Sequence, residues 1–154
     1  MPQANEIILA QLRDTMLAAG RFDRRTAELM GINTTDLSCL NFVETSPEPV
    51  TAKMLADYVG ISSGSTTALI DRLERRGLLA RQNHPTDRRG IVVVAGPAAN
   101  DPAVVSLRAR FREVADMTLA DLGANDKAVI TTFLGRLIAT LDADLAAPDR
   151  LERP

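Results

Sequence analysis

The fold of this chain is decided by the stretch from Thr51 to Val94, which reads TAKMLADYVGISSGSTTALIDRLERRGLLARQNHPTDRRGIVVV. Its first part predicts a short helix that begins after Thr51 and ends at Gly60. Threonine is a favourable N-cap, and glycine readily adopts the left-handed conformation found at a helix end. The apolar residues of this part have the i, i+3, i+4, i+7 spacing of one buried helix face: Ala52, Leu55, Ala56 and Val59.

A second helix is predicted directly after the first, with Ser62 as its N-cap and Gly77 as its stop. A 3.6-residue wheel divides its side chains between two faces. The inward face comprises Thr66, Leu69, Ile70 and Leu73, and the outward face comprises Gly64, Thr67, Ala68, Asp71 and Arg75. Two helices joined by so short a turn that contains a glycine have the spacing of a helix-turn-helix.

A hairpin is predicted after the second helix. Leu78 to Gln82 and Ile91 to Val94 are short runs suited to strands, and the intervening residues 84–90 contain the Pro and Gly of a turn. Adjacent arginines lie at its tip. A helix-turn-helix followed by a basic hairpin indicates a winged helix that reads DNA. The second helix fits the major groove, and the hairpin arginines can reach phosphates or a narrow minor groove.

These motifs together resemble the multiple-antibiotic-resistance regulator (MarR) family. The resemblance is carried by Ile61-Ser62, by the run from Asp71 to Arg81 and by Asp87-Arg88-Arg89, and weaker motifs extend it over most of the chain. It implies a dimeric winged-helix transcription regulator. Two features depart from the family pattern. Ala95-Gly96-Pro97-Ala98 replaces a Leu-Thr-x-x-Gly-like run, and Ala68 stands where many relatives carry an arginine.

Length and composition are those of one globular domain. The chain has 154 residues, of which 45% are hydrophobic and 25% charged. No run approaches the roughly 18 apolar residues that a membrane helix needs. The N-terminus lacks a secretory signal pattern. We therefore expect a cytoplasmic protein without a membrane partner. The single cysteine, Cys39, excludes an internal disulfide and a cysteine-based metal cluster.

The net charge of −2 disfavours nucleic acid at first sight, but the distribution of charge favours it. Six arginines lie between residues 72 and 89: Arg72, Arg75, Arg76, Arg81, Arg88 and Arg89. The alternative is that arginine is simply common in this chain, as at Arg108, Arg110 and Arg112.

Helices are predicted on both sides of the winged helix. Residues 6–30 carry one long apolar stripe that Gly20 interrupts, and Asn33 or Thr34 can cap the helix that follows. Asp101-Pro102 opens a helix that Gly123 closes, and Asn125 is the expected cap of a last helix that is apolar around much of its girth.

The predicted fold is therefore mainly α with a small β-hairpin wing. We expect a single domain over 1–154, with a winged-helix DNA-binding region at 33–95, dimerisation helices at 6–30 and 101–147, and a polar tail at 148–154. The resemblance implies that the terminal helices pack on a second subunit. A two-fold homodimer would read a palindromic operator in double-stranded DNA.

The sequence lacks the groups of residues that a catalytic site needs. Its only histidine, His84, falls in the wing, where we expect it to be solvated or near phosphate, and Cys39 is at a core-facing position. There is no carboxylate pair at a catalytic spacing, no phosphate-binding glycine loop and no histidine cluster. We expect no catalytic activity, no metal and no cofactor.

The residues expected to contact DNA fall into three groups. Base edges are within reach of Ser63, Ser65, Thr67 and Ala68, although Ser63 and Ser65 could instead be capping residues. Phosphate candidates are Lys53, Tyr58, Arg72 and Arg75. The family's wing pattern carries over onto Asp87, which would brace the wing by pairing with an arginine, and Arg89, which would enter the minor groove. Arg88 could share either role.

The regulatory ligand is not predicted by this sequence. The family resemblance implies a small aromatic or phenolic effector that releases a repressor, but no residue can be assigned to it. The alternative function is a winged helix that contacts other proteins and does not bind DNA. The basic wing tip and the hydroxyl-rich start of the second helix favour DNA.

Overall fold

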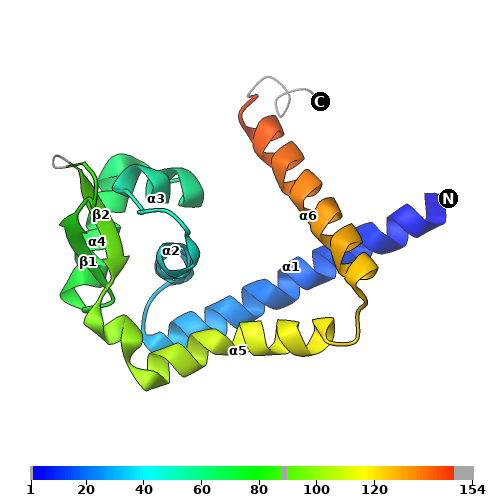
Figure 1. Cartoon of the computed structure of the whole chain (residues 1–154), viewed down its shortest axis with the longest axis horizontal. Helices are drawn as coiled ribbons and strands as arrows, with labels where there is room; N and C mark the ends of the chain where they lie inside the picture. Colours follow the sequence, from blue (N-terminus) through cyan, green and yellow to red (C-terminus); the bar gives the residue numbers. More distant parts are fainter. Residues whose placement is uncertain (1, 88–89, 148–154) are drawn as a thin grey trace. The chain divides into compact units, whose positions relative to one another are not determined.

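The computed structural model describes residues 2–87 and 90–147 of the chain. They form, in order, α1 (Pro2–Met30), α2 (Thr34–Thr45), α3 (Ala52–Val59), α4 (Ser63–Arg75), β1 (Leu79–Asn83), β2 (Ile91–Ala95), the 3-10 helix η1 (Pro97–Asn100), α5 (Pro102–Leu119) and α6 (Ala124–Leu145). The chain divides into two compact units, Met1–Phe111 and Arg112–Pro154. The first unit holds the winged helix (Figure 1). The predicted fold class is confirmed.

The helices of the winged helix begin and end where their capping residues predict. Asn33 caps α2 by accepting a hydrogen bond from the Asp36 N–H at 2.8 Å. Thr51 and Ser62 cap α3 and α4 in the same way. Gly60 has a φ of 68°, in the left-handed region where glycine is unstrained. The short α3–α4 connection therefore forms from local chemistry.

The wing is an antiparallel pair of strands. Its register runs from Leu79 opposite Ala95 to Asn83 opposite Ile91. Val50 adds one bridge, because its carbonyl accepts a hydrogen bond from the Val93 N–H at 2.8 Å. This bridge ties the start of the helix-turn-helix to the wing.

Gly96, in the run that departs from the family pattern, lies where only a glycine fits. A Cβ atom built on Gly96 would lie 2.3 Å from the carbonyl oxygen of Gly77, which is too close for any side chain. The Gly96 N–H also donates to the Leu78 carbonyl at 2.9 Å. The end of the wing is thus packed directly against the end of α4.

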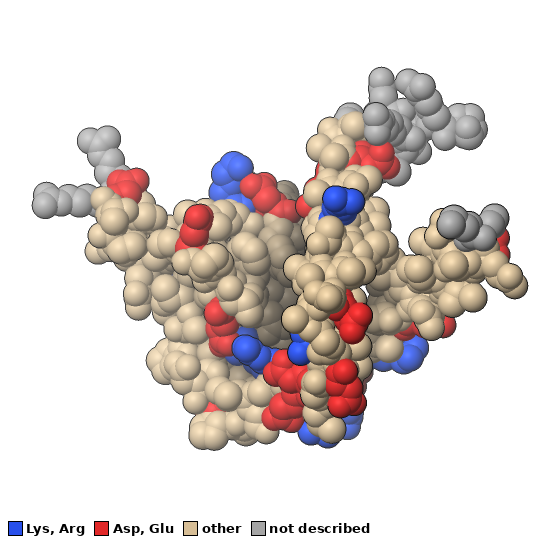
Figure 2. Space-filling model, turned by 45° about the vertical axis from the view of Figure 1, so that its right-hand side comes forward, with Lys and Arg blue, Asp and Glu red and all other residues tan. Residues whose placement is uncertain are grey.

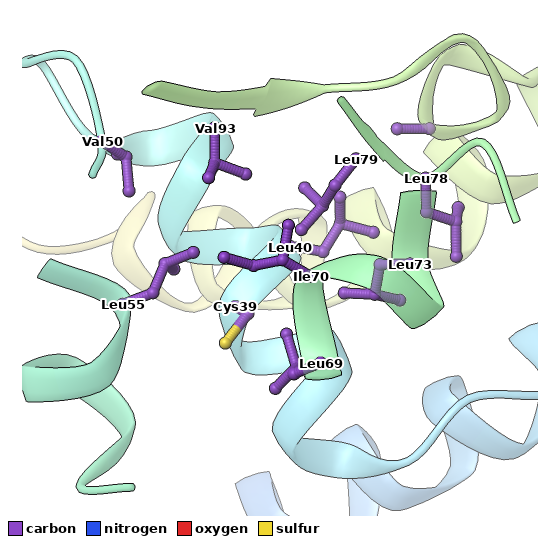
Figure 3. Close-up of a cluster of buried hydrophobic side chains, with 11 residues drawn as sticks. Cys39, Leu40, Val50, Leu55, Leu69, Ile70, Leu73, Leu78, Leu79 and Val93 are labelled. Carbon is purple, nitrogen blue, oxygen red and sulfur yellow. The ribbon is translucent and has the colours of Figure 1, made fainter. Parts of the chain in front are cut away.

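One apolar core joins α2, α3, α4 and the wing (Figure 3). Burying each leucine of this cluster contributes about 1.5–3 kcal/mol relative to leaving it exposed. The cluster consists of Cys39, Leu40, Val50, Leu55, Leu69, Ile70, Leu73, Leu78, Leu79, Val93 and Ala99. Thr66, also predicted to face inward, is 1% exposed. Ala52 differs from its prediction, because it is exposed and Met54 is the half-buried residue that packs on the core.

The last two helices differ from the prediction at their junction. Asp101 accepts a hydrogen bond from the Ala103 N–H at 2.8 Å, so α5 opens as expected. It ends at Leu119, however, and Gly123 is the N-cap of α6 rather than the stop of α5. Asp126 accepts from the Gly123 N–H at 3.3 Å, which places the start of α6 ahead of the expected cap, Asn125.

Three helices leave large apolar side chains exposed. On α1 these are Ile7, Ile8, Leu9, Met16, Leu17 and Leu29. On α5 they are Val105, Phe111, Val114, Met117 and Leu119. On α6 they are Val129, Ile130, Phe133, Leu134, Ile138, Leu141 and Leu145. Among the described residues, no helix is both long and apolar enough to cross a membrane.

Cys39 is the chain's one thiol and it lies fully inside the core. Burial and, to a smaller extent, the carboxylate of Asp36 raise the pKa of this thiol to about 11, and Arg72 opposes both. The thiolate, which is the nucleophile, is therefore scarce at neutral pH. This agrees with the interpretation of Cys39 as a small buried hydrophobe.

We predict that Cys39→Ser lowers the free energy of unfolding by on the order of 1 kcal/mol, because it places a hydroxyl in an apolar site. Urea titration measures this loss. In the unmodified protein a thiol reagent should react at the rate of unfolding, and mild peroxide should leave DNA binding intact. Peroxide-dependent loss of binding that thiol reverses, and that the serine variant lacks, would contradict this interpretation.

Candidate nucleic-acid interface

The outward face of α4 carries the side chains expected to reach base edges. Ser63, Ser65, Thr67 and Ala68 are all exposed. The Ser62 hydroxyl accepts from the Ser65 N–H at 3.2 Å and donates to the Ser65 hydroxyl at 3.0 Å, so Ser62 has the capping role expected of it. The Thr67 hydroxyl donates to the Ser63 carbonyl at 3.0 Å. Its oxygen can still accept a hydrogen bond from a base.

Arg72 lies on the same helix but turns toward α2. Its Nε donates to Oδ2 of Asp36 at 3.1 Å and its Nη2 donates to Oδ1 at 2.5 Å. The Asp36 side chain is 2% exposed, and the Arg72 side chain 42%. The hydrogen bond to Asp36 raises the pKa of Arg72 above its ordinary value. Arg72 therefore has a buried partner, and its contact with phosphate stays a prediction.

Two more of the six arginines have partners inside the protein. Arg76 donates from Nη1 to the Gly31 carbonyl at 2.5 Å and from Nη2 to the Met30 carbonyl at 2.7 Å. Arg81, on β1, pairs with Glu74 and with Asp71, the latter at 2.8 Å. Much of the positive charge counted in the sequence therefore holds the winged helix together.

The remaining phosphate candidates are exposed and lie on α3 and α4. Lys53 pairs with Asp57 at 2.9 Å on the surface of α3. Tyr58 is 56% exposed as a residue, and its ring stacks on Phe42, with ring centroids 4.3 Å apart. The Arg75 Nε donates to the Asp71 carbonyl one turn earlier, at 3.3 Å. The contacts of these three side chains with phosphate stay predictions.

His84 organises the base of the wing tip. Its Nδ1 accepts hydrogen bonds from the Thr86 N–H at 3.2 Å and the Asp87 N–H at 3.1 Å. The backbone N–H of His84 donates to the Gly90 carbonyl at 2.9 Å. His84 was expected to be solvated or near phosphate; its side chain is half-buried, and its bonds within the wing were not predicted. Arg88 and Arg89 lie outside the described residues, so their predicted contacts with DNA stay predictions. The same holds for the pairing of Asp87 with an arginine.

Figure 2 shows basic and acidic side chains scattered among other residues on one face of the molecule. On α4, the carboxylates of Asp71 and Glu74 both pair with Arg81. Among the described residues, no three His, Cys, Asp or Glu side chains are grouped so that they could hold a metal ion.

Comparison with known proteins gives the family. A model of the MarR family matches residues 30–90. The chain is 30% identical, over 127 residues, to the uncharacterized HTH-type transcriptional regulator YcgE of Bacillus subtilis (strain 168), and the match covers 80% of this chain and 79% of that protein. This protein belongs to the MarR family.

Solved structures agree with this assignment. The transcriptional regulator PA3341 is 27% identical with a TM-score of 0.65, and the match covers 90% of this chain and 98% of that one. The transcriptional regulator Tm0710 from Thermotoga maritima has the same fold at 22% identity, with a TM-score of 0.61, and the match covers 92% of this chain and 98% of that one. The MarR-family protein described here is thus a transcriptional regulator and not an enzyme.

We predict that His84→Ala loosens the wing tip, because the N–H groups of Thr86 and Asp87 lose their acceptor. A lost hydrogen bond of this kind costs about 1 kcal/mol. Hydrogen exchange at these two amides should accelerate several-fold while exchange in α4 stays constant. His84→Asn is the matched control, since its side-chain oxygen can occupy the place of Nδ1. Equal exchange in the alanine and asparagine variants would refute the bracing role.

Proposed function

We propose that this MarR-family regulator is a homodimeric repressor that binds a palindromic operator and is released by a small aromatic or phenolic ligand. The observation that carries the DNA-binding part is the exposed face of α4, where Ser63, Ser65, Thr67 and Ala68 lie at the start of the second helix of a helix-turn-helix. Residues at this end of a recognition helix contact base edges in the major groove.

The proposed dimer is supported by the exposed apolar residues of the terminal helices. On α6, Val129 is 69% exposed, Ile138 59% and Leu145 68%. Exposed apolar side chains grouped in this way are typical of an interaction surface, which supports the proposed dimer. In the proposal, residues 6–30 and 101–147 bury this surface against a second copy, and the winged helix over 33–95 reads DNA. Two-fold symmetry then presents two copies of α4 to two half-sites.

Two solved structures of the same fold support the binding partners. One is of a MepR mutant from S. aureus bound to an oligodeoxyribonucleotide, at 15% identity and a TM-score of 0.55. The other is of CouR from Rhodococcus jostii RHA1 bound to p-coumaroyl-CoA, at 20% identity and a TM-score of 0.59. The second ligand contains a phenolic group, which is the class proposed for this protein.

The partners of the arginines indicate which residues supply the free energy of DNA binding. Arg72, Arg76 and Arg81 are engaged within the protein, and Ala68 leaves the centre of α4 without a cation. Hydroxyls and a methyl group discriminate bases less well than an arginine does. A bidentate arginine contributes roughly 1–3 kcal/mol of discrimination against the wrong base. We infer that phosphate contacts and Arg89, in a narrow A·T-rich minor groove, supply much of the binding free energy.

We predict that deleting residues 1–25 gives monomer or aggregate and lowers DNA affinity. A finer test is Ile138→Glu on α6, which puts a charge into the proposed interface and should shift sedimentation toward monomer at micromolar concentration. Ile91→Glu on the wing is the matched control, since Ile91 is 50% exposed but lies outside the proposed interface. A folded, monomeric full-length protein at that concentration would contradict the dimer.

We predict that Arg89→Ala weakens operator binding at least tenfold, or by about 1.4 kcal/mol. The slope of log affinity against log salt should become shallower by up to about one unit per subunit. Thr67→Ala should cost less affinity and relax base preference within the half-site. Anisotropy titrations at several salt concentrations, on the operator and on point-mutated operators, measure both effects. The proposal fails if Arg89→Ala binds normally while Thr67→Ala does not bind.

A protein that selects no duplex from a randomised library would favour the protein-contact alternative.

A further inference from the structure

The recognition helix α4 is attached to the corner between α1 and α2 at two points. Arg72 forms the bidentate pair with Asp36 in the first turn of α2. Arg76, four residues later and therefore on the same side of the helix, donates to the carbonyls of Met30 and Gly31 at the end of α1. We call this pair of contacts the α4 clamp.

The clamp supplies a constraint that the apolar core does not supply. Leu69, Ile70 and Leu73 hold α4 against the core, but hydrophobic burial is non-directional and tolerates small rotations. A bidentate arginine–carboxylate pair has a fixed planar geometry. The clamp therefore adds a directional restraint on the rotation of α4 about its own axis.

Rotation of α4 decides which side chains meet the groove. Ala68 lies four residues before Arg72, on the same side of the helix, and Thr67 adjoins it in sequence. Positions four residues apart differ by only about 40° around the helix axis, so a rotation of that order changes which side chain points into the groove. Hydroxyl and methyl contacts are short, and they tolerate such an error poorly.

Burial makes the Asp36 end of the clamp rigid. The carboxylate is 2% exposed, and no described side-chain polar atom that is fully buried lacks a hydrogen-bond partner. Asp36 cannot leave Arg72 without placing an unpaired charge inside the protein, which is strongly unfavourable. The Arg76 end is exposed, but its two hydrogen bonds satisfy carbonyls at a helix end that would otherwise lack partners.

We infer that Asp36 and Arg76 are positioning residues for DNA recognition. They set the orientation of α4 through the clamp and control sequence discrimination without touching bases. This inference rests on the proposed DNA-binding function. It also gives α1, a proposed dimerisation helix, a direct hydrogen-bonded connection to the recognition helix.

The test compares Asp36→Asn, Arg76→Lys and the control Asp116→Asn. Asp36→Asn removes the charge that holds Arg72 but keeps every cation, and Arg76→Lys keeps the charge but loses the two-pronged donation. Asp116→Asn makes the same charge change in an exposed ion pair on α5. Each protein, shown to be folded by urea titration, is titrated with a duplex selected by the wild-type protein from a randomised library and with a scrambled duplex of equal composition.

We expect both clamp variants to lose at least tenfold in the ratio of selected to scrambled affinity. Affinity for the scrambled duplex should be retained in Arg76→Lys and retained or increased in Asp36→Asn, where Arg72 is freed for phosphate. The salt slope should not become shallower, and Asp116→Asn should keep the wild-type ratio.

The inference is overturned if a folded Asp36→Asn keeps the wild-type ratio, or if its two affinities fall by the same factor, as a general loss of structure would cause. If Asp36→Asn does not fold, Arg76→Lys decides by the same two criteria. Failure of the proposed function is a separate result, since the wild-type protein would then select no duplex.

Discussion

The burial of one face of α4 is the interaction on which the other features depend. Leu69, Ile70 and Leu73 fill the space between α2, α3 and the wing, and this leaves the opposite face of the same helix in water. The proposed recognition surface is thus the exposed face of a helix whose other face is buried in the core. The capping of α4 by Ser62 fixes where that surface begins.

Charge in this protein is used first for structure. Arginines that the sequence places near a DNA-binding surface bind Asp36, the end of α1, Asp71 and Glu74. Arg108 on α5 does the same, because it donates to Asn41 at 3.0 Å and pairs with Glu44 while only 8% of its side chain is exposed. In the proposed function, this structural use of arginine leaves wing residues and hydroxyls a larger part in contact with DNA.

The helices at the two ends of the chain differ from the winged helix in the apolar side chains that they leave exposed. These helices carry long, periodic apolar stripes, and large apolar side chains are exposed on both α1 and α6. In the proposed function, a second copy of the chain buries these side chains. The recognition helix would then be connected to that second copy through Met30 and Gly31.

Local patterns were sufficient to predict the winged helix. The caps Asn33, Thr51 and Ser62, the left-handed Gly60 and the inward face of α4 all depend on residues within one or two helical turns, where spacing in sequence equals proximity in space. The partners of charged side chains were decided by tertiary structure, because Asp36 and Arg72 are 36 positions apart and Arg76 and Gly31 are 45 apart. From sequence, an aspartate in the first turn of a helix is expected only to interact favourably with the helix dipole. The packing of α2 on α4 is what buries Asp36 and pairs it with Arg72.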